Sequence, residues 1–231
     1  MCEVMKSYRL GAFLLIVVIF FLNSCSQSPG DEGSLVSTGS HTKSGIIVAI
    51  DAGHGGEDFG THSNIKPRQH EKFLTLSTAF MVRDHLKRMG YKAVFIRSKD
   101  EFVPLRKRIA IASSQKATIL VSVHYNSAAN VKAHGVEVYY YRAKNPTNRT
   151  RESAKLAEAV LKHVLGYTKA KSRGVKHGDF CVVRDSTMPA ILVEGGFLTN
   201  AMEVKKLKNP RYVNDIARGI AQGIDDYFMM R

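Results

Sequence analysis

From about residue 44 onward, short apolar runs alternate with longer amphipathic stretches. The apolar runs, rich in β-branched residues, predict strands over 46–50, 93–97, 118–123, 135–141, 180–184 and 190–193. Apolar residues three and four positions apart predict helices over 71–89, 104–115, 151–165 and 211–228. Gly90 and Pro104 are typical of a helix end and a helix start. Asn200 and Glu203 have the spacing of a capping box and mark a further helix start.

Nearly continuous apolar strands between amphipathic helices indicate a sheet that is buried on both faces. We therefore expect an α/β fold, a three-layer sandwich with helices on both faces of the sheet. In such sheets ligands bind beyond the carboxyl ends of the strands, so residues that follow the strands are the first candidates for chemistry.

The N-terminal part has a different pattern. Residues 10–22 are apolar and follow Lys6 and Arg9, and this run is short beside the roughly 20 residues of a spanning helix. Such a pattern is typical of a secretory signal, the alternative being an uncleaved anchor. The sequence "LNSC" at 22–25 resembles the bacterial lipobox, which implies that Cys25 is lipidated. We expect a signal at 1–24, a Ser/Gly/Thr-rich tether at 25–44 and a catalytic domain at 45–231.

These assignments predict an exported, periplasmic protein that a lipid anchors to a membrane. Cys2 leaves with the signal, so Cys181 is the only free thiol and no intrachain disulfide forms. The formal net charge of +14 favours polyanions or anionic lipid. An exported protein seldom meets nucleic acid, and peptidoglycan, with its stem-peptide carboxylates, is an anionic polymer in that place. Charge alone does not choose between these partners, and a solvated basic surface is the alternative. We expect peptidoglycan and a membrane as partners, and a monomer.

Three residues with catalytic side chains follow predicted strands. His54 lies after 46–50, His124 after 118–123 and Glu194 after 190–193, whereas Glu71 begins the first helix. Each histidine alone could be a hydrogen-bonded structural residue, and Glu71 could only complement the helix dipole. A glutamate at the end of a buried strand needs a cation or several donors. Two histidines and one glutamate make a zinc site with an open position, and the other glutamate is then the general base.

Four motifs extend this interpretation. In order, "VAIDAGHGGEDFG", "HEKFLTLSTA", "SVHYNSA" and "RDSTMPAILVEGGFLTN" resemble those of the zinc-dependent N-acetylmuramoyl-L-alanine amidases of the amidase-3 type, over about residues 45–230. The resemblance implies a six-stranded mixed sheet and one zinc ion per chain, bound by His54, Glu71 and His124. It implies that Glu194 is the catalytic residue. The bond cut would join the muramic-acid lactyl group to L-alanine of the stem peptide, in cell-wall remodelling or cell separation.

Two features refine the expected site. Asn126 and Arg184 lie in these motifs and are candidates for substrate binding, although a supporting or plain surface role is the alternative. Some family members carry a plugging helix between the strand that ends near Tyr141 and the next helix. Here only 142–150 separates them, so we expect activity without an activator.

Other functions remain open from the sequence. Ser113 and Lys116 fit the S-x-x-K pattern of serine acyl enzymes such as penicillin-binding proteins. A zinc peptidase that cuts elsewhere in the stem peptide is closer to the main hypothesis. A non-catalytic lipoprotein that binds the wall is a third possibility.

Overall fold

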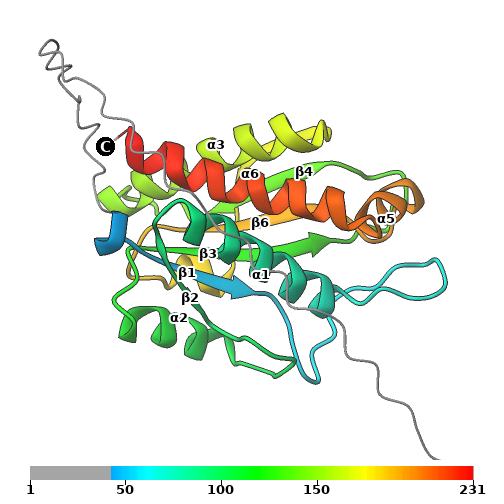
Figure 1. Ribbon diagram of the computed structural model, residues 1–231, viewed down its shortest axis with the longest axis horizontal. Helices are drawn as coiled ribbons and strands as arrows, with labels where there is room; N and C mark the ends of the chain where they lie inside the picture. The colour runs from blue at the N-terminus through cyan, green and yellow to red at the C-terminus, as the bar shows by residue number, and fades with distance from the viewer. Residues whose placement is uncertain (1–42, 231) are drawn as a thin grey trace, which may run out of the picture. The chain divides into compact units, whose positions relative to one another are not determined.

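A computed structural model describes residues 43–230 of the chain (Figure 1). The predicted signal, the lipidation site Cys25 and all but the last two residues of the predicted tether lie outside the described residues. Within the described part, no helix has the length and apolar character needed to cross a membrane.

The centre of the domain is one six-stranded mixed sheet, as expected. Its strands are β1 (Ile47–Ala52), β2 (Lys92–Phe95), β3 (Ile119–Asn126), β4 (Val136–Tyr140), β5 (Ser172–His177) and β6 (Ala190–Phe197). Their order is β2-β1-β3-β6-β4-β5. The pairs β1–β2, β1–β3, β3–β6 and β4–β5 are parallel, whereas β4 and β6 are antiparallel. The carboxyl ends of β1, β3 and β6 therefore meet at one edge.

Helices cover both faces of this sheet (Figure 1). One face carries α1 (Glu71–Arg88), α3 (Asn148–Thr168) and α6 (Pro210–Met229), and the other carries α2 (Leu105–Ser114) and α4 (Cys181–Arg184). The short α5 (Ala201–Leu207) precedes α6. Two glycines let α6 approach α3 closely, because a Cβ on Gly219 or Gly223 would lie within 2.5 Å of the Cα of Val164 or Val160. The three-layer prediction is confirmed.

The edge formed by the carboxyl ends of β1, β3 and β6 is the functional edge of the sheet. The alternation of side chains along each strand decides which residues lie on which face at this edge. Val121 and Val123 of β3 pack toward α1, α3 and α6, whereas Leu120 packs toward α2 and α4. Continued at a period of two, the Leu120 face includes His124. Leu192 of β6 also lies on this second face, which therefore includes Glu194.

Two sequence-based assignments were wrong. The predicted strand 180–184 is instead the N-cap residue Phe180 and the helix α4, because a four-residue apolar run that contains Val182 and Val183 fits a buried helical turn equally well. Strand β5 was missed because its sequence, SRGVKH, is mostly polar and lies at the sheet edge. The predicted start of α5 is confirmed, since the Asn200 side chain accepts hydrogen bonds from the backbone nitrogens of Met202 and Glu203.

The described chain begins at the end of the sheet opposite the functional edge. Lys43–Gly45 forms a single turn of 3-10 helix directly before β1. The Lys43 ammonium group forms an ion pair with Asp225, near the C-terminal end of α6. Asp225 also accepts a hydrogen bond from the Tyr91 hydroxyl at 2.8 Å. These contacts fasten the start of the domain to its last helix.

Candidate metal centre

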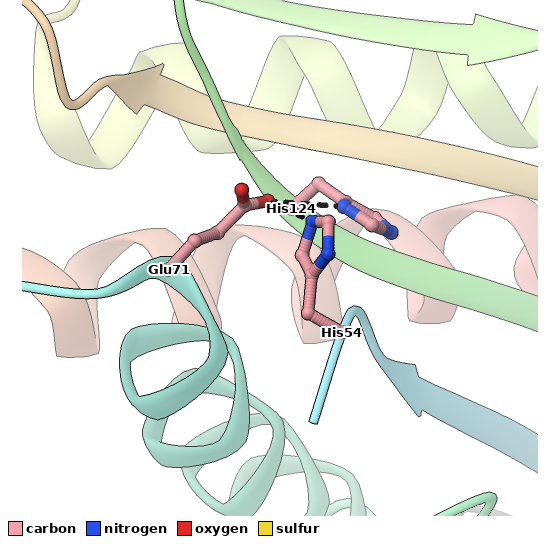
Figure 2. Close-up of side chains that lie close together, drawn as sticks. All are labelled: His54, Glu71 and His124. Carbon is pink, nitrogen blue, oxygen red and sulfur yellow. Dashed lines mark hydrogen bonds and ion pairs between the residues drawn. The ribbon is translucent and has the colours of Figure 1, made fainter. Parts of the chain in front are cut away.

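Three of the predicted site residues converge at the functional edge (Figure 2). His54 lies in the turn after β1, Glu71 is the first residue of α1, and His124 lies near the carboxyl end of β3. One potential ligand atom from each lies within 4.8 Å of the others. Across residues 43–230, no second cluster of three such side chains has this geometry.

Glu71 is the centre of the cluster. Its Oε1 atom lies 3.0 Å from Nε2 of His54 and 3.0 Å from Nδ1 of His124. Backbone N–H groups orient the carboxylate, since Tyr125 donates to Oε1 at 3.0 Å and Thr61 donates to Oε2 at 2.9 Å. Ligands about 2.0–2.1 Å from a tetrahedral zinc ion are about 3.3 Å apart. The spacing therefore fits zinc with little movement of these side chains.

His54 is held from behind by a carboxylate. Its Nδ1–H donates to Asp58 Oδ2 at 2.8 Å, which leaves Nε2 facing Glu71. A second carboxylate of this kind commonly fixes the tautomer of a metal-binding histidine. The His54 backbone has φ of 61°, a left-handed conformation that residues other than glycine seldom adopt. Asp58 was not predicted as a site residue, although a carboxylate four residues after a metal-binding histidine could have indicated this contact.

Glycines on two sides make room for the cluster. A Cβ atom on Gly53 would lie 2.2 Å from Cε1 of His124. A Cβ atom on Gly60 would lie 2.6 Å from both Glu71 Oε2 and the His54 ring. Real Cβ atoms do not approach other atoms this closely, so any side chain at either position would displace a ligand group.

Buried arginines, which sequence analysis missed, fix the turn that carries His54. Arg108 pairs with Asp51 at 2.7 Å and donates to the His54 carbonyl at 2.8 Å. Asp51 also accepts from the Ser122 hydroxyl at 2.7 Å. Arg97 donates to the carbonyls of Ala52 and Gly53. These donors come from positions more than 40 residues along the chain, so no local pattern reveals the network.

The charges in the cluster shift the pKa values of two of its side chains, His54 and Glu71. Burial disfavours protonated His54, but the hydrogen bonds and charges of Glu71 and Asp58 outweigh it and raise the pKa of His54 above its ordinary 6.5. Burial likewise opposes ionisation of Glu71, yet hydrogen bonds from His124 and His54 hold the pKa of its carboxyl well below 4.5. Glu71 is therefore an ionised ligand at neutral pH, and a metal competes with protons for His54.

Glu194 lies beside the cluster on the next strand. Its Cα is the direct ladder partner of the His124 Cα between β3 and β6, so both side chains lie on the same face of the sheet. Burial, followed by the negative charges of Glu71 and Glu137, raises the pKa of Glu194 well above 4.5. Its Oε2 atom is buried and has no hydrogen-bond partner among the described residues. An unsatisfied buried carboxylate oxygen is costly unless a substrate, water or cation engages it.

The other candidates lie around the centre or away from it. Asn126 donates to Glu137 Oε1 at 2.6 Å, and Arg184 pairs with both Asp179 and Asp185. Ser113 is exposed, and its hydroxyl lies 3.2 Å from that of Thr187.

Lys116 lies beyond the end of the helix that carries Ser113, so a serine–lysine pair gains no support. His70 occupies the N-cap position of α1 without a side-chain capping hydrogen bond and lies outside the metal cluster.

A groove of about 580 Å³ opens beside the cluster on the face of α2 and α4. His54 and His124 are among the residues that line it. Its walls include the exposed Phe102 and Leu105, together with Phe180. The site is thus open to a polymer that crosses the edge of the sheet.

The donor set therefore fits a zinc ion. Two imidazoles and a carboxylate make a catalytic zinc site with one open position. Glu194, the ladder neighbour of His124 with a partnerless buried oxygen, is the candidate proton acceptor.

Comparisons with known proteins agree with this site. Residues 48–226 match the family model described as N-acetylmuramoyl-L-alanine amidase. The chain is 38% identical over 184 residues to the uncharacterised protein YqiI of Bacillus subtilis, covering 80% of this chain and 85% of YqiI. It is 34% identical to the N-acetylmuramoyl-L-alanine amidase LytC of Bacillus subtilis, covering 80% of this chain and 36% of LytC. It thus spans about a third of that longer relative.

The similarity extends to three dimensions. The crystal structure of an N-acetylmuramoyl-L-alanine amidase from Clostridium difficile 630 superimposes with a TM-score of 0.75 at 36% sequence identity. That alignment covers 80% of this chain and 98% of the other.

Proposed function

This chain belongs to the N-acetylmuramoyl-L-alanine amidase family, and we propose that it performs the family's reaction with a zinc ion held by His54, Glu71 and His124. The enzyme hydrolyses the amide that joins the lactyl group of N-acetylmuramic acid to L-alanine of the stem peptide, in cell-wall processes. The observation that carries the proposal is the buried, partnerless oxygen of Glu194 beside three converging metal ligands.

A zinc ion in this cluster supplies Lewis-acid chemistry, lowering the pKa of water toward about 7 and polarising the scissile carbonyl. Glu194 takes the proton of the attacking water on its carboxylate and passes it to the nitrogen of the leaving L-alanine. Burial and the charges of Glu71 and Glu137 raise the pKa of Glu194 well above 4.5, so its carboxyl group holds a proton more readily than an exposed carboxyl group does. Asp58 and Arg108 hold His54 in place during these steps.

The decisive experiment is digestion of purified muropeptides with and without a chelator, followed by mass spectrometry. We expect free stem peptide beginning with L-alanine only where the chelator is absent, and recovery of the activity when zinc is restored. Cleavage that persists after complete metal removal would overturn the zinc assignment. A product cut within the stem peptide would identify a peptidase instead of an amidase.

We further propose that the enzyme works without an activating partner. Strand β4 ends at Tyr140 and α3 begins at Asn148, and the segment between them is too short to form a helix that plugs the site. The His54 and His124 side chains instead line an open groove. The purified protein alone should therefore digest muropeptides at its full rate. Strong stimulation by a cell extract would contradict this proposal.

We also propose that the enzyme is exported and anchored by lipid at Cys25, as the sequence pattern at 22–25 indicates. In fractionated cells, the protein should be found with membranes, and Cys25→Ala should release it to the soluble exported fraction or leave it with an uncleaved signal. Recovery of the unaltered protein in soluble form would contradict the anchor.

A further inference from the structure

The functional edge presents its side chains in the order of the strands. From β1 to β4 these are His54, His124, Glu194 and Glu137. The side chain of Lys176 on β5, whose Cα pairs with that of Tyr139, reaches Glu137 with its ammonium group. Glu137 is the antiparallel ladder partner of Glu194, so the row continues on one face of the sheet. The metal ligands thus lie toward β1, and Glu194 lies between them and β5.

The β5 end of the row carries excess positive charge. The Glu137 carboxylate is only 2% exposed, and its Oε1 accepts from Asn126 and from the Tyr139 hydroxyl. Its Oε2 accepts from the Arg173 Nε at 2.7 Å and from the Lys176 ammonium group at 2.5 Å. One buried negative charge is therefore matched by two positive charges.

Both cations of this pair retain unused donors. The Arg173 side chain is 30% exposed and the Lys176 side chain is 36% exposed. In residues 43–230, no protein hydrogen bond involves the two terminal nitrogens of Arg173. A guanidinium group with its fork free is the preferred protein ligand of a carboxylate.

The β1 end of the row is lined by exposed apolar side chains. Phe102 and Leu105 are 48% and 55% exposed and line the groove beside His54. The cation of Arg108 in this groove is already paired with Asp51. Exposed aromatic and aliphatic faces suit the apolar faces of sugar rings.

Arg184, on the groove wall, does not change this distribution of charge. It forms ion pairs with both Asp179 and Asp185, so one positive charge meets two negative charges. Arg184 therefore contributes no excess positive charge, unlike Arg173 and Lys176.

The direction of proton transfer points the same way. In the proposed reaction Glu194 protonates the leaving amine, and this step rests on the proposed function. The amine belongs to the stem peptide, whereas the acyl group belongs to the sugar. Because Glu194 lies on the β5 side of the metal ligands, the peptide leaves toward β4 and β5.

We propose that the substrate crosses the edge in one direction, with the stem peptide over β4 and β5 and the glycan beside Phe102 and Leu105. Arg173 and Lys176 bind a carboxylate of the stem peptide and thereby select its charge state. A peptide whose D-glutamate carboxylate is free is preferred over the amidated form.

The test compares two disaccharide peptides that differ only in whether the D-glutamate α-carboxyl group is free or amidated. The native enzyme should cleave the free acid with a kcat/KM about fivefold higher, the size of one partly exposed charge pair. Lys176→Gln and Arg173→Gln should each lower this ratio toward one. Lys176→Arg should keep it, because the charge remains.

Lys87→Gln is the matched control. It removes the same charge at an exposed position near the end of α1, about 24 Å along the helix from Glu71. Its ratio should equal that of the native enzyme. A native ratio of one, or a ratio that neither Lys176→Gln nor Arg173→Gln changes, would overturn the proposal. Loss of cleavage of both substrates by the native enzyme would instead refute the proposed function.

The glycan end is tested with single disaccharide peptides and with longer glycan strands that carry the same peptide. Phe102→Ala should lower kcat/KM about threefold more for the long strands, because it removes a stacking surface. Phe73→Ala is the control, since Phe73 is equally exposed but lies in a separate hollow beside Leu207. A reversed pattern, in which Phe102→Ala changes charge selectivity and Lys176→Gln changes the dependence on glycan length, would overturn the direction.

Discussion

His124 and Glu194 are direct partners in the parallel ladder of β3 and β6. A metal ligand and the proposed proton carrier are therefore held side by side by the backbone hydrogen bonds of two central strands. Neither depends on a loop for its position. Functional groups on rigid elements keep their geometry more accurately than groups on loops.

Glu194→Gln should leave the metal site intact and abolish catalysis. Glutamine keeps the shape of the side chain but accepts no proton, so the rate should fall by about 10²–10⁴-fold. Elemental analysis should still find one zinc ion per chain. A variant that retains most of the activity would show that Glu194 does not carry the proton.

Gly53→Ala should disrupt metal binding through a single methyl group. The new Cβ would lie 2.2 Å from Cε1 of His124, so the imidazole must turn away from the cluster. We expect zinc affinity to fall at least about tenfold. The control is Gly45→Ala, since a Cβ there meets no atom within 4 Å. Equal zinc affinity of the two variants would contradict this account of the glycine.

Arg108→Ala should destabilise the fold and the His54 turn together. It leaves Asp51 buried without its ion partner and removes a donor from the His54 carbonyl. Breaking a buried pair in this way lowers the free energy of unfolding by about 3–5 kcal/mol, measurable by chemical denaturation. Arg106→Ala, at an exposed position on the same helix, should have little effect. Similar losses in both variants would argue against the buried pair.

Glu137 should make the stability of the fold depend on pH. Burial opposes its ionisation, but hydrogen bonds from Lys176, Arg173 and Tyr139 hold the pKa of Glu137 below its ordinary 4.5. A lowered folded pKa means that this stabilisation is complete above pH 4.5 and is lost as the pH falls through the folded value. The difference in unfolding free energy between the native protein and Glu137→Gln should therefore shrink in acid. A difference that stays constant from neutral pH to below pH 4.5 would exclude this role.

The strand ends explain why much of the site was predictable. Each of His54, His124 and Glu194 follows a run of buried residues that a periodic pattern detects, and parallel strands bring their carboxyl ends to one edge. Glu71 followed from the start of a strongly periodic helix. The assignment of these residues to metal and proton transfer came from the family motifs.

The parts that escaped prediction depend on tertiary contacts. Asp51 and Arg108 lie 57 residues apart in sequence, and neither has a local pattern that names the other. Arg173 and Lys176 lie on an edge strand whose polar sequence and Gly174, at φ of 87°, hide its pairing with β4. Glu203 kept its place in the capping motif but accepts from the Phe197 and Gly135 nitrogens, which sequence spacing does not reveal.

The ion pair of Lys43 with Asp225 fixes the place where the chain enters the catalytic domain. The chain enters the sheet at the amino end of β1, whereas cleavage takes place beyond the carboxyl end, about 20 Å away along that strand. The preceding segment therefore joins the domain at the end of the sheet opposite the catalytic edge. If Cys25 carries the lipid, residues 25–43 span at most about 60 Å. The greatest distance of the catalytic edge from the membrane is then this span plus the depth of the domain. In that case we expect wall beyond this distance to be out of reach, so the length of residues 26–42 would set how far from the membrane the enzyme cuts.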